Sequence, residues 1–176
     1  MSDSTLATPA SNISPAKTRR ALDAILFGGL AAGILDGLWA AGMTSFRGGS
    51  PMRMFQFIAS GLIGRSSFNG GIATSLLGVL LHFFIAFTLA TIFYAASTKL
   101  PQLARQPFLW GPLYGILAYL GMNFVVVPLS LVARQPLTTG RVIQGMIVHM
   151  VLVGLPIALS ARRSVRKAPQ IQETSA

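Results

Sequence analysis

The sequence predicts an all-α membrane protein built as a bundle of four transmembrane helices. Four apolar segments, residues 22–46, 72–97, 107–131 and 141–160, come near or exceed the ~20 residues that a helix needs to cross a bilayer. Only 10% of the 176 residues are charged, against about 25% in soluble domains, and the mean hydropathy is +0.63. These spans and their connections use up the chain, so we expect no separate soluble domain within it.

The first element is a polar tail, residues 1–21, which we expect to be disordered because Ser, Thr, Ala and Pro dominate its beginning. The first span follows and carries Gly29, Gly33 and Gly37 at four-residue intervals on one face. Such a row of small residues lets another helix approach closely. We expect the row to pack within the chain, with homo-oligomerisation through the same three glycines as the alternative.

Residues 51–64 predict an amphipathic helix between the first and second spans. Ser50 and Pro51 suit the N-cap and the first helical position. Apolar residues then recur at helical spacing, and Gln56 and Ser60 fall on another face. The segment is too short to cross a bilayer. We therefore expect it to lie in the outer interface, with a re-entrant segment as the alternative.

The remaining elements follow from breakers and flanking charges. Pro107 suits the first turn of the third span. Pro128 and Pro156 are expected to kink the third and fourth spans near one end. The fourth span is followed by a basic tail, residues 161–176.

A weak internal repeat suggests a duplicated helical hairpin. The first and third spans share a Gly-xxx-Gly-Ile-Leu motif that begins at Gly29 and at Gly111. The second and fourth spans share a Gly-xxx-His motif that ends at His82 and at His149. Spans one and three cross in the same direction, as do spans two and four. Two hairpins related by an axis along the membrane normal would produce this pattern.

The basic residues predict the orientation in the membrane. Nine of the 14 Lys and Arg would lie on the side of the two termini and five on the other side. The positive-inside rule then favours cytoplasmic N- and C-termini in a bacterial inner (cytoplasmic) membrane. The five basic residues on the outer side are Arg47, Arg53, Arg65, Arg134 and Arg141. The net charge of +10 does not indicate nucleic-acid binding, because the basic residues mostly flank spans that contact the lipid bilayer.

Each span carries one polar residue at a similar depth. Asp36, His82, Asn123 and His149 lie about eight to ten residues from the outer end of their spans, which is roughly 12–15 Å deep. Polar groups are costly in lipid, so they usually face the bundle interior and often mark a site. Simple packing hydrogen bonds between helices, worth perhaps ~0.6 kcal/mol each, would also explain them.

Three kinds of ligand fit this polar centre. Asp36 and the histidines could handle a proton or a small polar ligand, with the outer arginines guiding an anion. His82 and His149 could instead ligate a b-type haem, with Gly78 and Gly145 leaving room for the porphyrin, an arrangement that resembles the general plan of membrane b-type cytochromes. Asp36, His82 and His149 could also hold Zn²⁺ or another metal ion. The sequence itself requires no cofactor.

Signatures of enzymes are missing from the sequence. It has no P-loop, no HExxH and no G-x-S-x-G motif, and it has no cysteine. We therefore expect a non-enzymatic membrane protein. Its polar centre would bind a small ligand or a proton, or the chain would serve as a structural partner of other membrane proteins.

Several stretches carry a resemblance to a known family. They read AGILDGLW, SPMRMFQFIASGLIGR, GVLLHFFIAF, MNFVVVPLS and VHMVLVGLPIAL. Together they resemble a family of small bacterial inner-membrane proteins without assigned function, similar in size and plan to the YagU-like group. The resemblance covers roughly residues 22–160 and implies four spans and an inner-membrane location. It implies no catalytic or binding residues.

Overall fold

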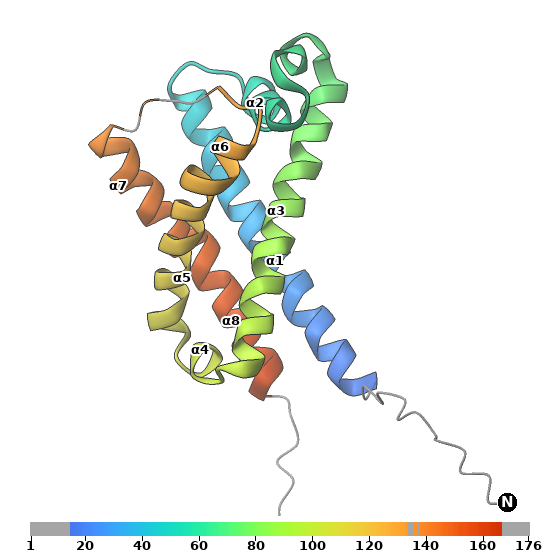
Figure 1. The fold of residues 1–176 in the computed structure, drawn as a ribbon, viewed down its shortest axis with the longest axis vertical. Coiled ribbons are helices and arrows are strands. Elements are labelled where there is room, and N and C mark those ends of the chain that lie inside the picture. The colour runs from blue at the N-terminus through green and yellow to red at the C-terminus, as the bar shows by residue number, and fades with distance from the viewer. Residues whose placement is uncertain (1–14, 134–135, 137, 167–176) are drawn as a thin grey trace, which may run out of the picture.

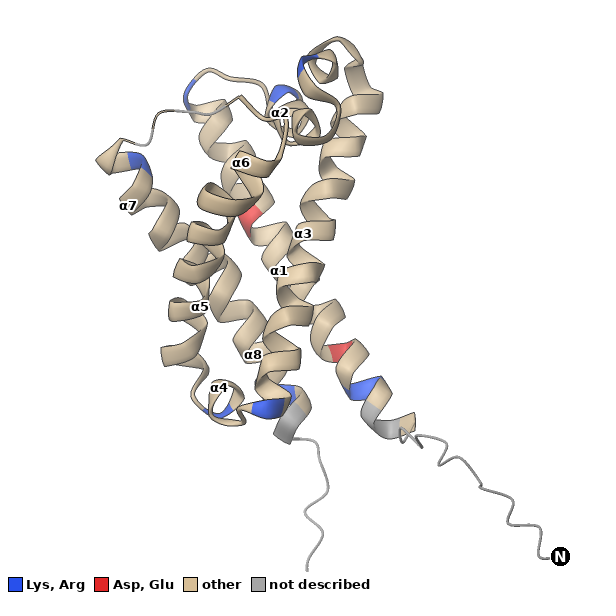
Figure 2. Ribbon diagram, viewed as in Figure 1, with Lys and Arg blue, Asp and Glu red and all other residues tan. Residues whose placement is uncertain are grey.

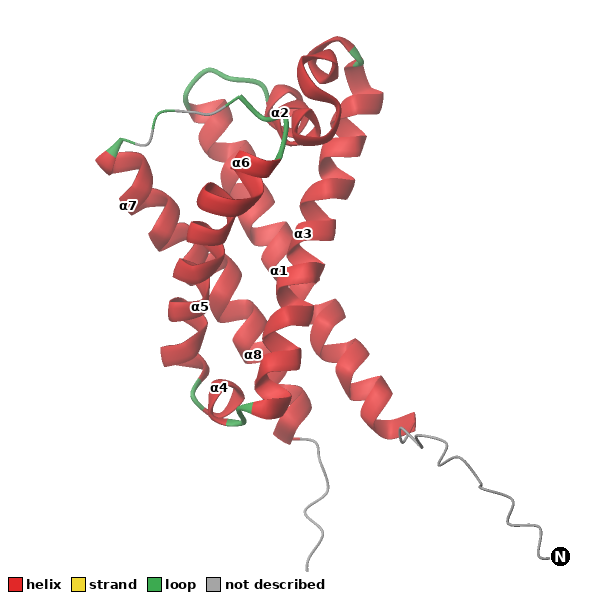
Figure 3. Ribbon diagram, in the orientation of Figure 1, coloured by secondary structure: helices red, strands yellow, loops and turns green. Residues whose placement is uncertain are grey.

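The computed structural model describes residues 15–133, 136 and 138–166, and these residues form helices and short connections without a strand (Figures 1 and 3). Four helical segments in this part of the chain are long and apolar enough to cross a membrane. They are Thr18–Phe46, Gly71–Lys99, Pro107–Leu129 and Thr139–Ser164. The all-α fold class and the four spans are therefore confirmed.

The first half of the chain forms two long helices with a short helix between them. In order they are α1 (Pro15–Phe46), α2 (Pro51–Ile63), the 3₁₀ segment η1 (Gly64–Asn69) and α3 (Gly71–Lys99). Helix α1 begins inside the segment that was expected to be a disordered tail. The reason is local: Pro15 suits a first helical position, and neither Gly nor Pro follows before Gly28.

The second half contains shorter helical pieces that continue into one another. In order they are α4 (Gln102–Arg105), α5 (Pro107–Gly121), the π-helical segment η2 (Met122–Val126), α6 (Val127–Leu129), α7 (Thr139–Val148), the π-helical segment η3 (His149–Gly154) and α8 (Leu155–Arg166). Helix α8 runs past the expected start of the basic tail, because Ala161 and Ser164 are buried against the bundle.

Each expected proline distortion takes the form of a wide π-helical turn. Segment η2 ends just before Pro128, and η3 ends just before Pro156. Proline has no N–H, and its ring crowds the carbonyl four residues earlier, so the preceding turn widens. Asn123 and His149 both lie in these turns.

The glycine row of α1 packs against α3 of the same chain. A Cβ atom at Gly29 or Gly33 would collide with the rings of Phe87 and Phe83, and one at Gly37 would crowd the His82 ring. All three glycines are buried. The row is therefore filled within one chain. In the second half, Gly115 lies against the backbone of His149. The hairpin duplication stays a prediction.

The two ends of the bundle differ in packing. Both described ends of the chain, together with α4, lie at one end, which we call the termini end (Figure 1). A core of small and apolar residues fills that half: Ala32, Ala90, Phe93, Ala104, Val153, Ile157, Ala158 and Ala161. At the opposite end, the α2 end, α7 leans away from the other helices and has no buried residue (Figure 1). The bundle is therefore packed at the termini end and open beside α7 at the α2 end.

Helix α2 turns part of its polar side toward the protein. Gln56 and Ser60 are buried, whereas Leu62 is 59% exposed. Gln56 donates from Nε2 to the Gly71 carbonyl oxygen at 2.9 Å. The helical spacing predicts an apolar anchoring face for this helix, and the burial of these two polar residues differs from that expectation. A helix beside lipid favours this arrangement, because polar groups find partners only within the protein.

Candidate functional site

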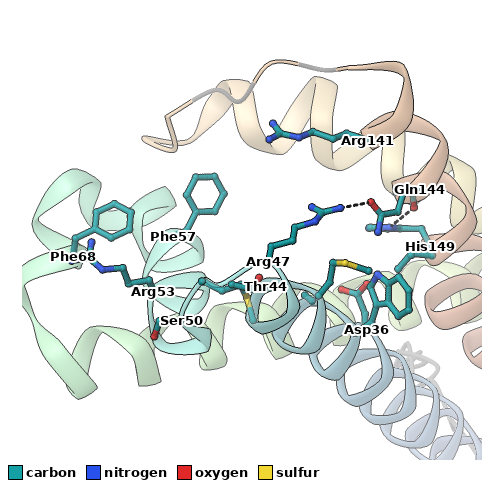
Figure 4. Close-up of a pocket in the computed structure, with 17 residues that line it drawn as sticks. Asp36, Thr44, Arg47, Ser50, Arg53, Phe57, Phe68, Arg141, Gln144 and His149 are labelled. Carbon is teal, nitrogen blue, oxygen red and sulfur yellow. Dashed lines mark hydrogen bonds between the residues drawn. The ribbon is translucent and has the colours of Figure 1, made fainter.

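A large cavity opens at the α2 end, between the end of α1, helix α2 and helix α7. Its volume is about 760 Å³. We call it the arginine vestibule, because three arginines line it (Figure 4): Arg47 from the turn after α1, Arg53 from α2 and Arg141 from α7. The other lining residues are Asp36, Trp39, Ala40, Met43, Thr44, Gly49, Ser50, Met54, Phe57, Phe68, Gln144, Gly145, Val148 and His149.

The arginines give the vestibule a positive potential. Arg47 donates from Nη2 to the Gln144 side-chain oxygen at 3.0 Å and so bridges α1 and α7 (Figure 4). Arg141 donates from Nη1 to the Pro136 carbonyl oxygen at 3.4 Å. Each guanidinium carries five N–H donors, so donors remain for a ligand. Clustered guanidinium groups around a concave surface attract and bind anions.

Three of the five predicted outer arginines line the vestibule. Arg65 lies exposed on η1 and does not line it, and Arg134 lies outside the described residues. In Figure 2, basic residues occupy both ends of the molecule and leave the middle of the spans free of positive charge.

A smaller inner cavity continues from the vestibule into the bundle. Its volume is about 190 Å³, the liquid volume of roughly six water molecules. Asp36, His82 and His149 line it together with apolar residues such as Ile58 and Met122. Three of the four predicted polar residues are thus brought together. Asp36 and His149 line both cavities, so they form the boundary between the vestibule and the inner cavity.

Each histidine has one ring nitrogen fixed by a backbone carbonyl. His82 donates from Nε2 to the Gly33 oxygen at 2.9 Å, across from α3 to α1. His149 donates from Nδ1 to the Gly145 oxygen at 2.9 Å, on its own helix. Because a carbonyl only accepts, these bonds set the tautomers. The other nitrogen of each ring is left to accept a proton or a ligand hydrogen bond.

Asp36 differs from the other polar residues of the centre. It is partly buried, and no described residue forms a hydrogen bond or an ion pair with its carboxylate. A charged group inside a span without a partner is costly, so it is rarely retained for packing alone. Its carboxylate is therefore a candidate for contact with a ligand.

Asn123 is separated from the polar centre. It donates from Nδ2 to the Tyr119 carbonyl oxygen at 2.9 Å, one turn earlier on its own helix. It lines another cavity of about 360 Å³, beside Phe57 and Arg141. The common depth that the sequence indicated did not place it against Asp36, because the π turn directs its amide back along the third span.

The metal and haem alternatives receive no support from the geometry. Among the described residues, no group of three His, Asp or Glu could hold a metal ion. The space that a porphyrin would need beside Gly78 and Gly145 is filled by the Phe55 carbonyl and the Tyr119 ring. His82 Nε2, the nitrogen that most often ligates haem iron, already bonds to Gly33. Haem binding by His82 and His149 stays a prediction.

Sequence reasoning missed Trp39 and Gln144. Both line the vestibule. Helical spacing contained a signal in each helix. One face of α1 carries Asp36, Ala40 and Met43, and one face of α7 carries Arg141, Gln144, Gly145 and Val148. That these two faces oppose each other depends on how the helices pack.

The fold and these cavities define a class, a multi-pass α-helical membrane protein with a polar cavity open at one end. A scan against protein-family models finds no match to the chain. Searches of curated proteins and of solved structures find no match either.

Proposed function

We propose that this protein binds a small anionic ligand in the arginine vestibule and takes up a proton at the polar centre when it does so. The observation that carries the proposal is the position of Asp36. This carboxylate lines the same cavity as Arg47, Arg53 and Arg141, and it also lines the inner cavity with His82 and His149. Asp36 therefore connects the arginines of the vestibule with the histidines of the inner cavity.

The linkage follows from the signs of the charges. An anion in the vestibule is attracted by three guanidinium groups and repelled by an ionised Asp36. Protonation of Asp36, or of His82 or His149, makes the site more positive and strengthens anion binding. By reciprocity, the bound anion favours proton uptake by the same factor. Affinity should therefore rise as the pH falls.

The membrane setting completes the proposal. We infer a bacterial inner membrane, with both termini cytoplasmic, from the excess of basic residues at the termini end. The vestibule would then face the periplasm. The motifs quoted above support kinship with the YagU-like group.

Sulfate is a suitable probe, because its charge stays constant between about pH 5 and about pH 8, where histidine titrates. Binding to the detergent-purified protein would be measured by calorimetry across that range. We expect tighter binding at the lower pH. Asp36→Asn should bind sulfate more tightly at the higher pH and depend less on pH.

Arginine variants test where the anion binds. Arg47→Gln and Arg141→Gln should each weaken sulfate binding about tenfold, the value of one charge-assisted hydrogen bond of ~1.5 kcal/mol. Arg65→Gln is the matched control, because Arg65 is an exposed arginine at the same end that does not line the vestibule. Equal effects of all three variants would refute the vestibule as the site. A role as a structural partner alone predicts no sulfate binding and no effect of Asp36→Asn beyond stability or assembly.

A further inference from the structure

A fourth cavity lies between α1 and the α7–η3 helix. Its volume is about 560 Å³. We call it the lateral groove; its lining includes Trp39, Ile143, Gln144, Ile147, Val148 and Val151. Trp39, Gln144 and Val148 also line the arginine vestibule, so the two cavities adjoin.

The groove has the length of one bilayer leaflet. Its lining extends from Gly140, near the start of α7, to Leu152 in η3. Twelve helical steps of ~1.5 Å give roughly 18 Å. Half of the hydrocarbon core is about 15 Å. The groove therefore extends from the arginines at the α2 end to about the middle of the membrane, on the side where α7 leans away (Figure 1).

The chemistry of the groove is that of an acyl-chain site. All of its lining side chains except Gln144 are apolar or glycine, with the Trp39 ring on the α1 side. Ile143, Ile147 and Val151 lie on a membrane span and are 54%, 55% and 50% exposed, so an acyl chain can contact them. Gln144 marks the junction with the vestibule, where it accepts a hydrogen bond from Arg47. An apolar channel that ends at guanidinium groups is complementary to an amphiphile with an anionic head.

We propose that the ligand of the vestibule is an anionic lipid from the leaflet at the α2 end. Its headgroup lies between Arg47 and Arg141, and one acyl chain lies in the lateral groove. This inference rests on the proposed function, because it takes the vestibule as the anion site. It adds the chemical class of the ligand and a route of entry through the bilayer rather than from the water phase.

A natural tryptophan can report on this site through its fluorescence. It contains two tryptophans, and only Trp39 lines the groove. The Trp110 ring nitrogen is buried without a hydrogen-bond partner, so Trp110→Phe removes no hydrogen bond and leaves Trp39 as the single fluorophore. Trp39→Phe leaves Trp110, on α5 near the termini end, as the control fluorophore.

The experiment compares two lipids brominated on the acyl chain, because bromine quenches tryptophan fluorescence on contact. The Trp110→Phe protein is reconstituted into phosphatidylcholine vesicles that contain increasing fractions of brominated phosphatidylglycerol or brominated phosphatidylcholine. We expect Trp39 to be quenched at a severalfold lower fraction of phosphatidylglycerol, and Trp110 to show no preference. Arg47→Gln and Arg141→Gln should each lower the preference about fivefold at most. Arg65→Gln should leave it unchanged.

A second pair of variants tests the groove. Val148→Phe adds volume at the junction and should reduce quenching by phosphatidylglycerol. Leu80→Phe is the control, because Leu80 is 68% exposed on α3 and does not line the groove.

The outcomes separate the two proposals. If sulfate binds through the arginines but both lipids quench Trp39 equally, the lipid inference is overturned and the proposed function stands. If neither sulfate binding nor a lipid preference depends on Arg47 and Arg141, both are overturned. If neither lipid quenches Trp39 and cross-linking shows a second copy over the groove, the lipid inference is overturned in favour of a helix contact.

Discussion

At the scale of single residues, most polar groups inside the bundle donate a hydrogen bond to a nearby backbone carbonyl. Tyr114 donates to the Leu89 oxygen at 2.7 Å, and Ser160 donates to the Ala24 oxygen at 3.0 Å. His82 bonds in the same way. Such bonds contribute modestly in membranes, ~0.6 kcal/mol on average, but they remove the penalty of an unpaired group. Asp36 has no such bond to a described residue, and the proposed function rests on this difference.

Asp36→Asn should not destabilise the protein. The change removes a charge without a partner and keeps the shape of the side chain, so we expect the free energy of unfolding to stay constant or rise by about 1 kcal/mol. Thermal unfolding in detergent, followed by tryptophan fluorescence, would measure this. Asp23→Asn, on the same helix near the termini end, is the control. A clear loss of stability in Asp36→Asn alone would instead indicate a packing role.

Gly78→Ala should loosen the contact between α2 and α3. A Cβ atom there would collide with the Phe55 carbonyl, and a backbone atom cannot move aside as a flexible side chain can. We expect a loss of about 1–3 kcal/mol in unfolding free energy, typical of overpacking. Gly42→Ala is the matched control on α1, because its Cβ atom would meet no atom within 4 Å. The control should be neutral or slightly stabilising, since alanine favours helix. Equal melting temperatures for both variants would contradict the close contact.

At the scale of elements, the spans were predictable because span length and hydropathy are local properties. The packing of α2 against its neighbours was less predictable. Its spacing indicated a short amphipathic helix, but the burial of Gln56 depends on the Gly71 carbonyl and Thr74, which lie beyond a turn. The π turns before the two prolines were visible only as an expected kink. Of the polar centre, Asp36, His82 and His149 were brought together as the common depth indicated, whereas Asn123 was not.

Gln56→Leu should weaken the docking of α2. Gln56 is 1% exposed and donates to the Gly71 oxygen at 2.9 Å and to the Thr74 hydroxyl at 3.3 Å. Leucine would leave the Gly71 carbonyl short of this donor, at a cost of about 1–3 kcal/mol. Limited proteolysis of the connection between α1 and α2 should become faster. Gln102→Leu is the control, because Gln102 is exposed on α4. Unchanged cleavage in Gln56→Leu would show that this hydrogen bond does not hold α2 in place.

At the scale of the whole molecule, the helices pack closely at the termini end, whereas α7 stands apart from them at the α2 end. The small-residue core holds α1, α3, α4 and α8 together at the termini end. At the α2 end, the Arg47–Gln144 hydrogen bond links α1 to the leaning α7 across the vestibule. A ligand that inserts between these helices would therefore displace few apolar contacts.

The orientation of this asymmetric molecule is open to a direct test, because the chain has no cysteine and a single introduced one gives an unambiguous label. Ser66 on η1 and Thr98 near the end of α3 are both exposed, at opposite ends of the bundle. In the sequence, nine of the 14 Lys and Arg flank span ends on the side of the termini and five flank the other span ends, so we expect the α2 end to face the periplasm. Ser66→Cys should then react with a membrane-impermeant maleimide in intact inner-membrane spheroplasts, and Thr98→Cys only after permeabilisation. The reverse pattern would place the vestibule on the cytoplasmic side. The anion would then come from the cytoplasm and the lipid from the inner leaflet, whose surface is also anionic.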